Sequence, residues 1–518
     1  MHLPCLVVLL GLSASSFAGV TVQKPGLVVP PAYASHRDDA EKLFVTSYNA
    51  YREFAFGHDD LSPVSKSFSD GRNGWGASIV DAMPTMFVMG LTDFFNEAVN
   101  FSSNIDFSKS QTSDTVSLFE TTIRYVGGLL SAYELSGEAY PVLVTKAKEV
   151  ADKMAFAWVG SNIAEAGTLS LEWFTLSKYT NNATYANLTA KSVKRIASLP
   201  APLPGLAAQG IDPSSGQFVG GYVTWGGGSD SYFEYLLKYA RLTNTDDTTF
   251  IDTWKTSTVG NHLYLADFDD QRLIRHVGSQ LASWYRTTLP LLECSSHYLS
   301  GGKLLQNQTI IDIALELNEG CWNTYASTVT GIGPEAFAYI SSDGNFTGGG
   351  GISSSQLAFY QKNGFYITAS DYIQRPEVLE SNFHAWRVTG DTKYLDRAAS
   401  AIASFNRFLP ATVAFAGLND VNSRNGGLID DMESFWFAEV LKYLYLTFDD
   451  PEHISLDDYV FNTECQPFKA PPALSSYAGS GKLIPQKPFT TQSGQLPAIS
   501  PNPNLPVPLK TIINPQGF

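Results

Sequence analysis

A long succession of helical segments joined by short polar turns most constrains the fold of this chain. It extends over about residues 37–446 of the 518. Apolar residues fall three or four positions apart at Val116, Phe119, Ile123, Val126, Leu130 and Tyr133. This spacing places them on one face of a helix. Ser113 and Asp114 indicate its start and Gly137 its end, so we expect a single helix here.

Turns of similar composition recur where one predicted helix gives way to the next. They occupy residues 135–138, 179–182, 242–246 and 388–391, and an aromatic residue follows each within a few positions. Such turns are typical of two antiparallel helices joined as a hairpin. Consecutive hairpins must bury their apolar faces, and a closed ring achieves this. The chain is therefore predicted to be all-α, with an α/α barrel favoured over an open superhelix.

Other segments are predicted to lie outside the helices. Glycine-rich stretches at 226–228 and 348–351 indicate loops at the rim of the barrel. Residues 458–463 alternate as a short strand, so we expect a small β-hairpin to close the domain. From residue 469 onward prolines punctuate a polar segment. We expect a barrel domain over residues 19–468 and a disordered tail over 469–518.

The first 18 residues have the pattern of a secretory signal peptide. An apolar run from Cys5 to Leu12 precedes Ser16-Phe17-Ala18, which places small residues at the cleavage positions. The apolar run is too short to span a bilayer, and no later stretch is long enough. Five sequons for N-glycosylation follow, at Asn100, Asn182, Asn187, Asn307 and Asn345. We expect the mature chain to be secreted or to reside in the ER or Golgi lumen.

Charge and cysteine content narrow the partners and the covalent structure. The 34 basic and 50 acidic residues give a net charge of −16, which disfavours binding to nucleic acid or to anionic membranes. Cys5 leaves with the signal peptide, and the oxidising compartment favours pairing two of the other three cysteines. Cys294 and Cys321 would close a loop of ordinary size, so we expect this disulfide and a free Cys465.

Two acidic residues occupy unusual helical positions. Glu120 lies on the apolar side of the predicted helix, where burial would raise its pKa, as a general acid requires. A salt bridge to Arg124, four residues on, is the structural alternative. Asp230 precedes an apolar helix at Ser231, with Glu234 placed to complete a capping box. The simplest interpretation of Asp230 is therefore an N-cap.

Acids embedded among aromatic residues indicate a carbohydrate site. Arg375-Pro376-Glu377 begins a helix in which Glu380 shares a face with Glu377, and residues 431–439 intersperse three more acids with Phe435 and other aromatics. Buried acids are costly unless they bind a sugar, a metal or an arginine. No Walker, HExxH, GxSxG or CxxC motif is present, so phosphoryl transfer, zinc proteolysis, α/β-hydrolase chemistry and redox exchange lack support.

Seven motifs, in order, resemble those of class I α-1,2-mannosidases, glycoside hydrolase family 47. They are residues 58–63, 74–82, 119–124, 230–236, 375–377, 432–435 and 460–464, and the resemblance covers about residues 40–468. It implies an (α/α)7 barrel of consecutive hairpins, plugged at one end by the C-terminal β-hairpin. It also implies calcium-dependent, inverting hydrolysis of α-1,2-linked mannose from high-mannose N-glycans. A monomer is expected.

The resemblance also implies individual roles. Glu120 matches the general acid, Glu377 the general base, and Asp230 the third essential carboxylate. Thr463 matches the threonine that binds Ca²⁺. Substrate-binding positions are matched by Arg124, Arg375, Glu335, Glu380, Glu433, Phe435 and Glu439, of which Glu335, Glu380 and Glu439 would also hold the waters of the calcium ion. Inversion requires the two carboxyl groups to stand about 6.5–9.5 Å apart.

The sequence departs from the family pattern at a few positions. Leu291 stands where the family has a histidine three residues before the first disulfide cysteine, and Gln374 replaces a leucine. Cys465 replaces a common alanine, and the proline-rich tail is an addition. Leu291 favours the main alternative, a mannose-binding quality-control lectin of the same barrel with little or no hydrolysis. A glycosidase for another sugar is a third interpretation, against which the calcium threonine argues.

Overall fold

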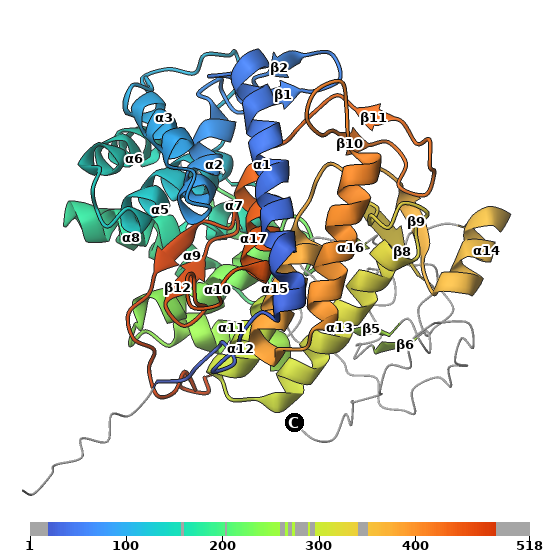
Figure 1. Cartoon of the computed structure of the whole chain (residues 1–518). Helices are drawn as coiled ribbons and strands as arrows, with labels where there is room; N and C mark the ends of the chain where they lie inside the picture. Colours follow the sequence, from blue (N-terminus) through green and yellow to red (C-terminus); the bar gives the residue numbers. More distant parts are fainter. Residues whose placement is uncertain are drawn as a thin grey trace, which may run out of the picture.

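The computed structural model describes residues 19–156, 160–202, 205–259, 265–267, 272–274, 289–290, 296–339 and 351–482. The predicted signal peptide, Leu291, Cys294, Asn345 and residues 348–350 lie outside the described residues. The described part is mostly helical, and its sheets are small (Figure 1). The long helices are α1 (Ala34–Phe54), α2 (Ala77–Val88), α3 (Thr92–Ser103), α5 (Gly127–Leu135), α6 (Pro141–Met154), α8 (Ser170–Thr180), α9 (Thr184–Ser198), α10 (Asp230–Thr243), α11 (Thr249–Val259), α12 (Ser296–Leu304), α13 (Gln308–Ala326), α14 (Ser354–Asn363), α15 (Glu377–Thr389), α16 (Lys393–Phe408) and α17 (Leu441–Phe448).

Shorter helical pieces connect or extend these helices. They are the 3₁₀ turn η1 (Pro31–Tyr33), α4 (Leu118–Glu120), α7 (Ile163–Gly167) and two π-helical turns, η2 (Thr121–Val126) and η3 (Trp436–Val440). The turn η2 leads directly into α5, and η3 leads directly into α17. Wide turns of this kind are often found at functional sites.

The helices form two concentric sets. One set makes successive neighbour contacts in the order α2, α5, α8, α10, α12, α15 and α17, and α17 returns to α2 directly and through η3. Each of these helices also packs on one helix of the other set, in the order α3, α6, α9, α11, α13, α16 and α1. Figure 1 shows α1, α13 and α16 in front of α15 and α17. The contacts therefore close into a circuit.

Side-chain burial explains why the two sets differ. In α10 every residue from Ser231 to Leu242 is buried, and in α15 every residue from Val378 to Val388 is buried. The outer helix α16 buries only one stripe, which includes Leu395, Ile402 and Phe405. A helix covered on all sides belongs in an interior, whereas an amphipathic helix faces solvent on one side.

Short antiparallel strands lie in the connections between the helices. The strands are β1 (Asp60–Ser62) with β2 (Ser67–Ser69), β3 (Gly210–Asp212) with β4 (Gln217–Val219), β5 (Leu265–Asp267) with β6 (Arg272–Ile274), β10 (Gly417–Leu418) with β11 (Leu428–Ile429), and the three-stranded set β7 (Leu289–Pro290), β8 (Ala336–Ala338) and β9 (Tyr366–Ala369). The expected C-terminal hairpin is confirmed as β12 (Tyr459–Phe461) with β13 (Pro467–Lys469), in which Tyr459 is opposite Lys469.

The helix that carries Glu120 starts later than predicted. Ser117 is its N-cap, and the Ser117 hydroxyl accepts a hydrogen bond from the Glu120 N–H at 3.2 Å. Val116 lies outside the helix and is 40% exposed. The prediction of a start at residues 113–114 was wrong because this segment forms its own turns, in which the Thr112 hydroxyl accepts from the Asp114 N–H.

The first part of the predicted tail packs on the helical body. Carbonyls of Pro471 and Pro472 accept hydrogen bonds from Arg241 and Asn244, both at 2.8 Å. Further along, the Asp252 carboxylate of α11 accepts from the Ser480 and Gly481 backbone N–H groups at 3.0 Å and from the Ser480 hydroxyl. Residues 470–482 therefore form a strap across α10 and α11, in contrast to the expected disorder. Residues 483–518 lie outside the described residues.

Removing the carboxylate that anchors the strap should destabilise the fold. Asp252 is buried and accepts from three donors of the strap. Asp252→Ala leaves these donors unpaired, so we expect a loss of about 1–3 kcal/mol in the free energy of unfolding. Urea denaturation measures it. Asp246→Ala, at an exposed position nearby, is the control. Equal midpoints for the two variants would contradict the strap's contribution.

Candidate active site

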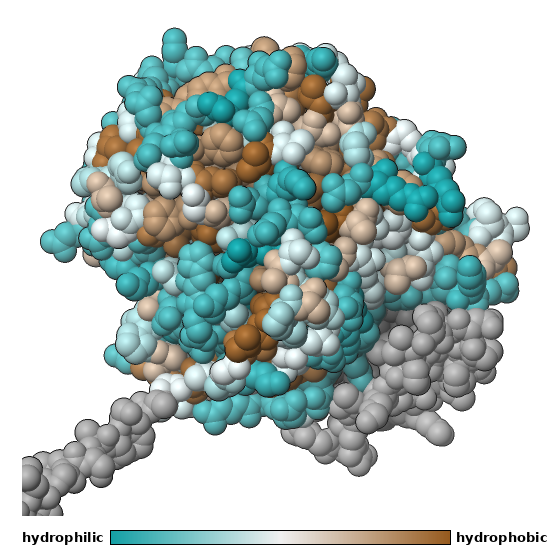
Figure 2. Space-filling view, viewed as in Figure 1, coloured by the Kyte–Doolittle hydropathy of each residue, from teal (hydrophilic) through white to brown (hydrophobic). Residues whose placement is uncertain are grey.

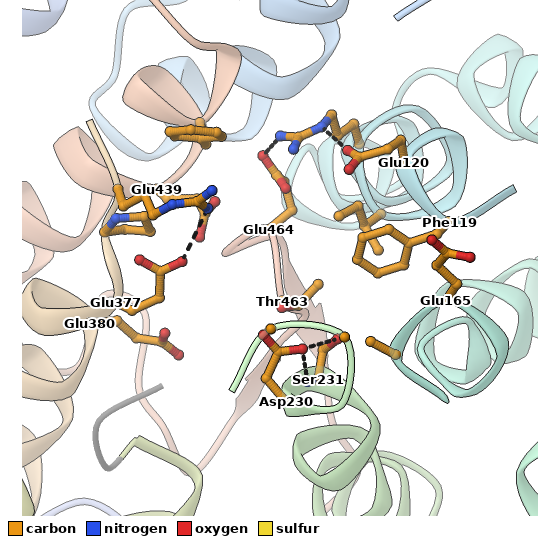
Figure 3. Close-up of a pocket in the computed structure, with 18 of the residues that line it drawn as sticks. Phe119, Glu120, Glu165, Asp230, Ser231, Glu377, Glu380, Glu439, Thr463 and Glu464 are labelled. Carbon is orange, nitrogen blue, oxygen red and sulfur yellow. Dashed lines mark hydrogen bonds and ion pairs between the residues drawn. The ribbon is translucent and has the colours of Figure 1, made fainter. Parts of the chain in front are cut away.

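A single cavity of about 280 Å³ brings together residues from distant parts of the chain. It is lined by Phe119, Glu120, Ile123, Arg124, Asn162, Ala164, Glu165, Gly227, Gly228, Asp230, Ser231, Arg375, Pro376, Glu377, Glu380, Phe435, Glu439, Thr463 and Glu464. Figure 3 shows Glu377 and Glu380 on one side of the cavity and Glu120 on the opposite side, with Thr463 between them. The loop at 226–228, predicted to lie at the rim, contributes two glycines.

Most of the predicted site residues line this cavity. The three predicted catalytic carboxylates, Glu120, Asp230 and Glu377, are all present, and so is Thr463. Glu335 and Glu433 are not among the lining residues. The Glu335 carboxylate instead accepts from Arg375 Nε at 2.6 Å, and that of Glu433 pairs with Arg72 at 2.5 Å. Their expected contact with substrate stays a prediction.

One wall is built from the wide turn η2. Glu120 ends α4, and its carboxylate accepts from Arg124 Nε at 2.8 Å. The buried Arg124 guanidinium also donates to Asp81 at 3.3 Å, to the Ser434 hydroxyl at 3.2 Å and to Glu464. The salt bridge considered as an alternative for Glu120 is therefore formed, while the same carboxylate faces the cavity.

The expected raised pKa of Glu120 was wrong. Removal from water does raise it, but the positive charges of Arg124 and Arg72 and the hydrogen bond from Arg124 outweigh this effect. The pKa of Glu120 consequently lies below its ordinary value. Helical spacing predicted the contact with Arg124 but not the approach of Arg72, which comes from the loop after β2.

The opposite wall is built from the start of α15. Burial raises the pKa of Glu377 to about 8, although the Arg375 guanidinium, 3.8 Å away, acts in the opposite direction. Burial also raises the pKa of Glu380 to about 7, against the charge of Lys238. The pKa of Glu439, on η3, is raised well above its ordinary value by burial and by the nearby carboxylates of Glu464 and Glu377. The acids on this wall therefore do not all ionise at neutral pH.

Asp230 lies at the mouth of α10, beside Thr463 (Figure 3). Its carboxylate accepts from the Ser231 N–H at 2.9 Å, and burial raises its pKa to about 6. Ser229, not Asp230, is the N-cap, and no side chain caps this end. The predicted capping box is not formed, because Glu234 instead pairs with Lys238. Asp230 therefore does not act as the N-cap that its sequence position suggested.

A buried network fixes the hairpin turn that carries Thr463. Tyr235 donates to the Glu172 carboxylate at 2.6 Å and accepts from the Thr463 N–H at 3.3 Å. Asn462 donates to the same Glu172 oxygen at 2.7 Å, and its own side-chain oxygen accepts from Glu464 N–H at 2.9 Å. The backbone around Thr463 is therefore held by groups on α8 and α10.

Phe435 presents an aromatic face between two cations. The Arg124 guanidinium carbon is 5.5 Å from the centre of the Phe435 ring, and that of Arg375 is 5.9 Å away. Cations over an aromatic face stabilise its position. The ring lines the cavity and is 5% exposed, so it offers an apolar edge among charged groups.

Several lining residues were not singled out from the sequence. Glu464 belongs to the motif at residues 460–464, from which no role was predicted for it, and it contacts Arg124. Glu165 and Asn162 form the N-terminus of the short helix α7, where Asn162 accepts from the Glu165 N–H at 2.9 Å. The pattern Asn-x-x-Glu could have indicated a capped helix start. It could not have indicated that this start opens onto the cavity.

The described residues include Cys321, Cys465 and four of the five sequons. Cys465 is free and buried, as expected. Cys321 is disulfide-bonded, but Cys294 lies outside the described residues, so the pairing stays a prediction. Asn100, Asn182 and Asn187 are exposed, and Asn307 is half-buried as the N-cap of α13. Gln374 adopts a positive φ of 70° and accepts from the Glu433 N–H at 3.2 Å.

The described residues contain neither a ready-made metal cluster nor a membrane-spanning helix. No group of three or more His, Cys, Asp or Glu side chains there is close enough to bind a metal directly. None of the described helices is both long and apolar enough to cross a membrane.

Comparison with known proteins identifies the class of enzyme that this fold and cavity belong to. The profile of glycosyl hydrolase family 47 matches residues 43–162 and 158–470, so the chain belongs to this family of glycoside hydrolases. It is 38% identical to "Mannosyl-oligosaccharide alpha-1,2-mannosidase 1B" of Aspergillus phoenicis, over 90% of this chain and 99% of that protein. It is 36% identical to the protein of the same name from Emericella nidulans, over 89% and 98%.

A solved structure supports the same assignment. The alpha-1,2-mannosidase from Trichoderma reesei superposes with a TM-score of 0.79 at 35% sequence identity, covering 84% of this chain and 99% of that one. The resemblance read from the seven motifs is confirmed.

The raised pKa values predict how the cation-free protein responds to pH. A carboxyl whose folded pKa exceeds its unfolded value stabilises the fold at low pH, and this contribution is lost as pH rises through the folded pKa. For Glu377 this pH range runs from the ordinary pKa of 4.5 to the folded pKa of about 8. We expect the free energy of unfolding to fall across it, and Glu377→Gln to remove roughly 2–4 kcal/mol of that fall.

Thermal denaturation in chelator at pH 5 and pH 8 measures this effect. Glu149→Gln, at a half-exposed position on α6, is the control and should keep the pH dependence of the parent protein. A Glu377→Gln variant with the unaltered pH dependence would show that Glu377 ionises normally.

Proposed function

We propose that this protein hydrolyses terminal α-1,2-linked mannose from high-mannose N-glycans with inversion of configuration. The observation that carries the proposal is the pair of carboxylates, Glu120 and Glu377, on opposite sides of one cavity (Figure 3). An inverting glycosidase needs an acid on one face of the sugar and a base, with room for water, on the other. The names of the family relatives support α-1,2-mannose as the substrate.

The proposed architecture is an (α/α)7 barrel plugged by the C-terminal β-hairpin. The closed circuit of helix contacts from α2 to α17 supports the barrel. The turn between β12 and β13 supports the plug, because its residues Thr463 and Glu464 line the cavity. In this arrangement the cavity opens at the end of the barrel opposite the hairpin.

The reaction requires two proton transfers. Glu120 donates a proton to the glycosidic oxygen as the bond from that oxygen to C1 of mannose breaks. Glu377 takes a proton from a water whose oxygen attacks C1 from the opposite face. The net change is the addition of one water. Arg124 and Arg375 orient the sugar hydroxyls, and Phe435 packs against the sugar ring.

Catalysis requires protonation states of Glu120 and Glu377 that differ from those of the protein without substrate and cation. The arginines keep Glu120 ionised when the cavity holds only water. Substrate excludes that water, which raises the pKa of a carboxyl and favours the acid form. Glu377, in contrast, holds a proton at neutral pH in the cation-free protein and must lose it to act as a base.

A bound Ca²⁺ would offset the concentration of acidic groups in the cavity. Six carboxylates line the cavity besides Glu120, and burial and mutual repulsion raise the pKa of several of them. Calcium takes six to eight oxygen ligands, including waters, hydroxyls and carbonyls. Thr463 would supply direct ligands, and Glu380 and Glu439 would hold waters of the ion. When bound, the cation supplies a positive charge that favours ionised carboxylates and orients sugar hydroxyls.

The proposed setting is the secretory pathway. The signal-peptide pattern and the exposed sequons support entry into it. The enzyme would act there as a monomer on glycoproteins or free oligosaccharides. The lectin alternative rests on Leu291, and release of free mannose distinguishes the enzyme from the lectin.

Calcium removal should abolish both activity and part of the stability. A ligand that binds only the native state stabilises it, by about 4 kcal/mol at a thousand times its Kd. We expect chelation to stop mannose release from a high-mannose glycan and to lower the Tm, and added Ca²⁺ to restore both. Thr463→Val should reproduce the loss at ordinary calcium concentrations. Full activity in a chelated sample would contradict the calcium assignment.

The two carboxylates should be essential for turnover and much less so for binding. An amide keeps the hydrogen bonds but cannot transfer a proton, so Glu120→Gln and Glu377→Gln should each reduce kcat by roughly 10²–10⁴-fold. Glu149→Gln is the matched control. Proton NMR of the first product should show β-mannose before mutarotation.

Two other results would redirect the assignment. Release of α-mannose would exclude the acid and base roles given to Glu120 and Glu377. Binding of the glycan without any release of mannose by the parent protein would identify the lectin.

A further inference from the structure

A surface groove beside α3 shares no residue with the catalytic cavity. It consists of two adjoining hollows of about 500 Å³ and 420 Å³ that have Phe56 and Glu97 in common. The larger is lined by Phe56, Gly74, Trp75, Glu97, Asn100, Phe101, Asn104, Ile105, Asp106 and Gln111. Figure 2 shows apolar residues among hydrophilic ones in the region that Figure 1 labels α2 and α3. The mechanism uses none of these residues.

Aromatic side chains form the apolar part of this groove. Phe56 is 41% exposed, and its ring packs edge-on against Phe101 with 5.5 Å between the ring centres. On its other side Phe101 packs closely on Gly76. A Cβ added to Gly76 would lie only 2.7 Å from the Phe101 ring. The Phe56 ring is thus supported by a fixed neighbour and still faces solvent. Exposed rings of this kind pack against the apolar faces of ligands.

Polar groups surround the rings. Asn104, Asp106 and Gln111 are exposed at the edge of the groove. Amide and carboxylate groups can bond both the hydroxyls and the acetamido group of an N-acetylhexosamine. A concave site with an apolar wall and a few polar groups is the usual form of a small-ligand site.

The position of a sequon indicates what occupies the groove. Asn100 is exposed, lines the groove and begins the sequon Asn100-Phe101-Ser102. A sugar attached to the Asn100 amide would therefore start inside it. Asn182 and Asn187 are also exposed, but they are not among the residues that line it. The occupant would be covalently tethered, so it would not need high intrinsic affinity to stay bound.

We propose that the N-linked glycan on Asn100 docks in this groove, with its first N-acetylglucosamine packed on Phe56. Modification requires entry into the secretory pathway, and in this respect the proposal rests on the proposed function. The docking itself does not depend on mannosidase activity, because it involves the core sugars and not the terminal mannoses.

Native deglycosylation tests the docking. The full chain is produced in a eukaryotic host that adds high-mannose glycans, and occupancy of Asn100 and Asn182 is measured by glycopeptide mass spectrometry. The folded protein is then treated with an endoglycosidase that cleaves between the two core N-acetylglucosamines. We expect release from Asn100 to be at least tenfold slower than release from Asn182. After denaturation the two rates should be equal.

Variants identify the ring as the cause. Phe56→Ala and Phe56→Leu should each raise the native release rate at Asn100 to within about threefold of that at Asn182. Phe68→Ala, at another exposed phenylalanine, is the control and should leave the slow release unchanged. An unoccupied Asn100, equal native rates at the two sites, or slow release that persists in both Phe56 variants would each overturn the proposal. Because no readout uses mannose release, failure here leaves the proposed function intact.

Discussion

The buried guanidinium of Arg124 connects parts of the fold that are remote in sequence. It contacts Glu120 on its own helix, Asp81 on α2, Ser434 before η3, and Glu464 in the C-terminal hairpin. An arginine keeps its positive charge inside a protein, so a buried guanidinium needs acidic or other hydrogen-bond acceptors around it. This requirement brings the first and last helices of the ring and the hairpin to one point. The cavity has its shape because these elements meet there.

The rest of the site follows from an imbalance of charge. Arginines on one wall keep Glu120 ionised, whereas Glu377, Glu380 and Glu439 on the other wall resist ionisation in the absence of a cation. An enzyme that works with both an acid and a base needs such a separation of pKa values. Without substrate and cation, however, the pKa of the proposed acid Glu120 is lowered and that of the proposed base Glu377 is raised, which is the reverse of what catalysis needs. Substrate and cation must therefore shift the pKa values of Glu120 and Glu377 before the site can act.

Local chemistry made much of this predictable. Turn composition and helical spacing indicated hairpins, and Arg375-Pro376-Glu377 marked the start of α15 correctly. The C-terminal strand was also found, because alternation is a local property. Predictions failed where distant groups decide the outcome. The pKa of Glu120 depends on Arg72, the capping box yielded to the pairing of Glu234 with Lys238, and the strap is held by Asp252.

Other features had no visible signal. The sequence of Thr121–Val126 does not distinguish a π-helical turn from an α-helical one, yet the wider turn carries Arg124, which binds Asp81 and Glu464. The resemblance to family 47 placed Glu335 and Glu433 among the substrate-binding residues. Their side chains are bound to Arg375 and Arg72, and only the folded packing reveals this.

The strap has a further consequence for how the molecule can be engineered. Where it crosses the surface, the Leu474 carbonyl accepts a hydrogen bond from the Val20 N–H at 2.9 Å, so segments from the two ends of the described fold lie side by side. Proteins with adjacent ends commonly tolerate circular permutation. A short linker from the strap to the N-terminal segment would allow new termini to be opened in a surface turn between two outer helices. The helical ring would then keep every contact while its order along the chain changed.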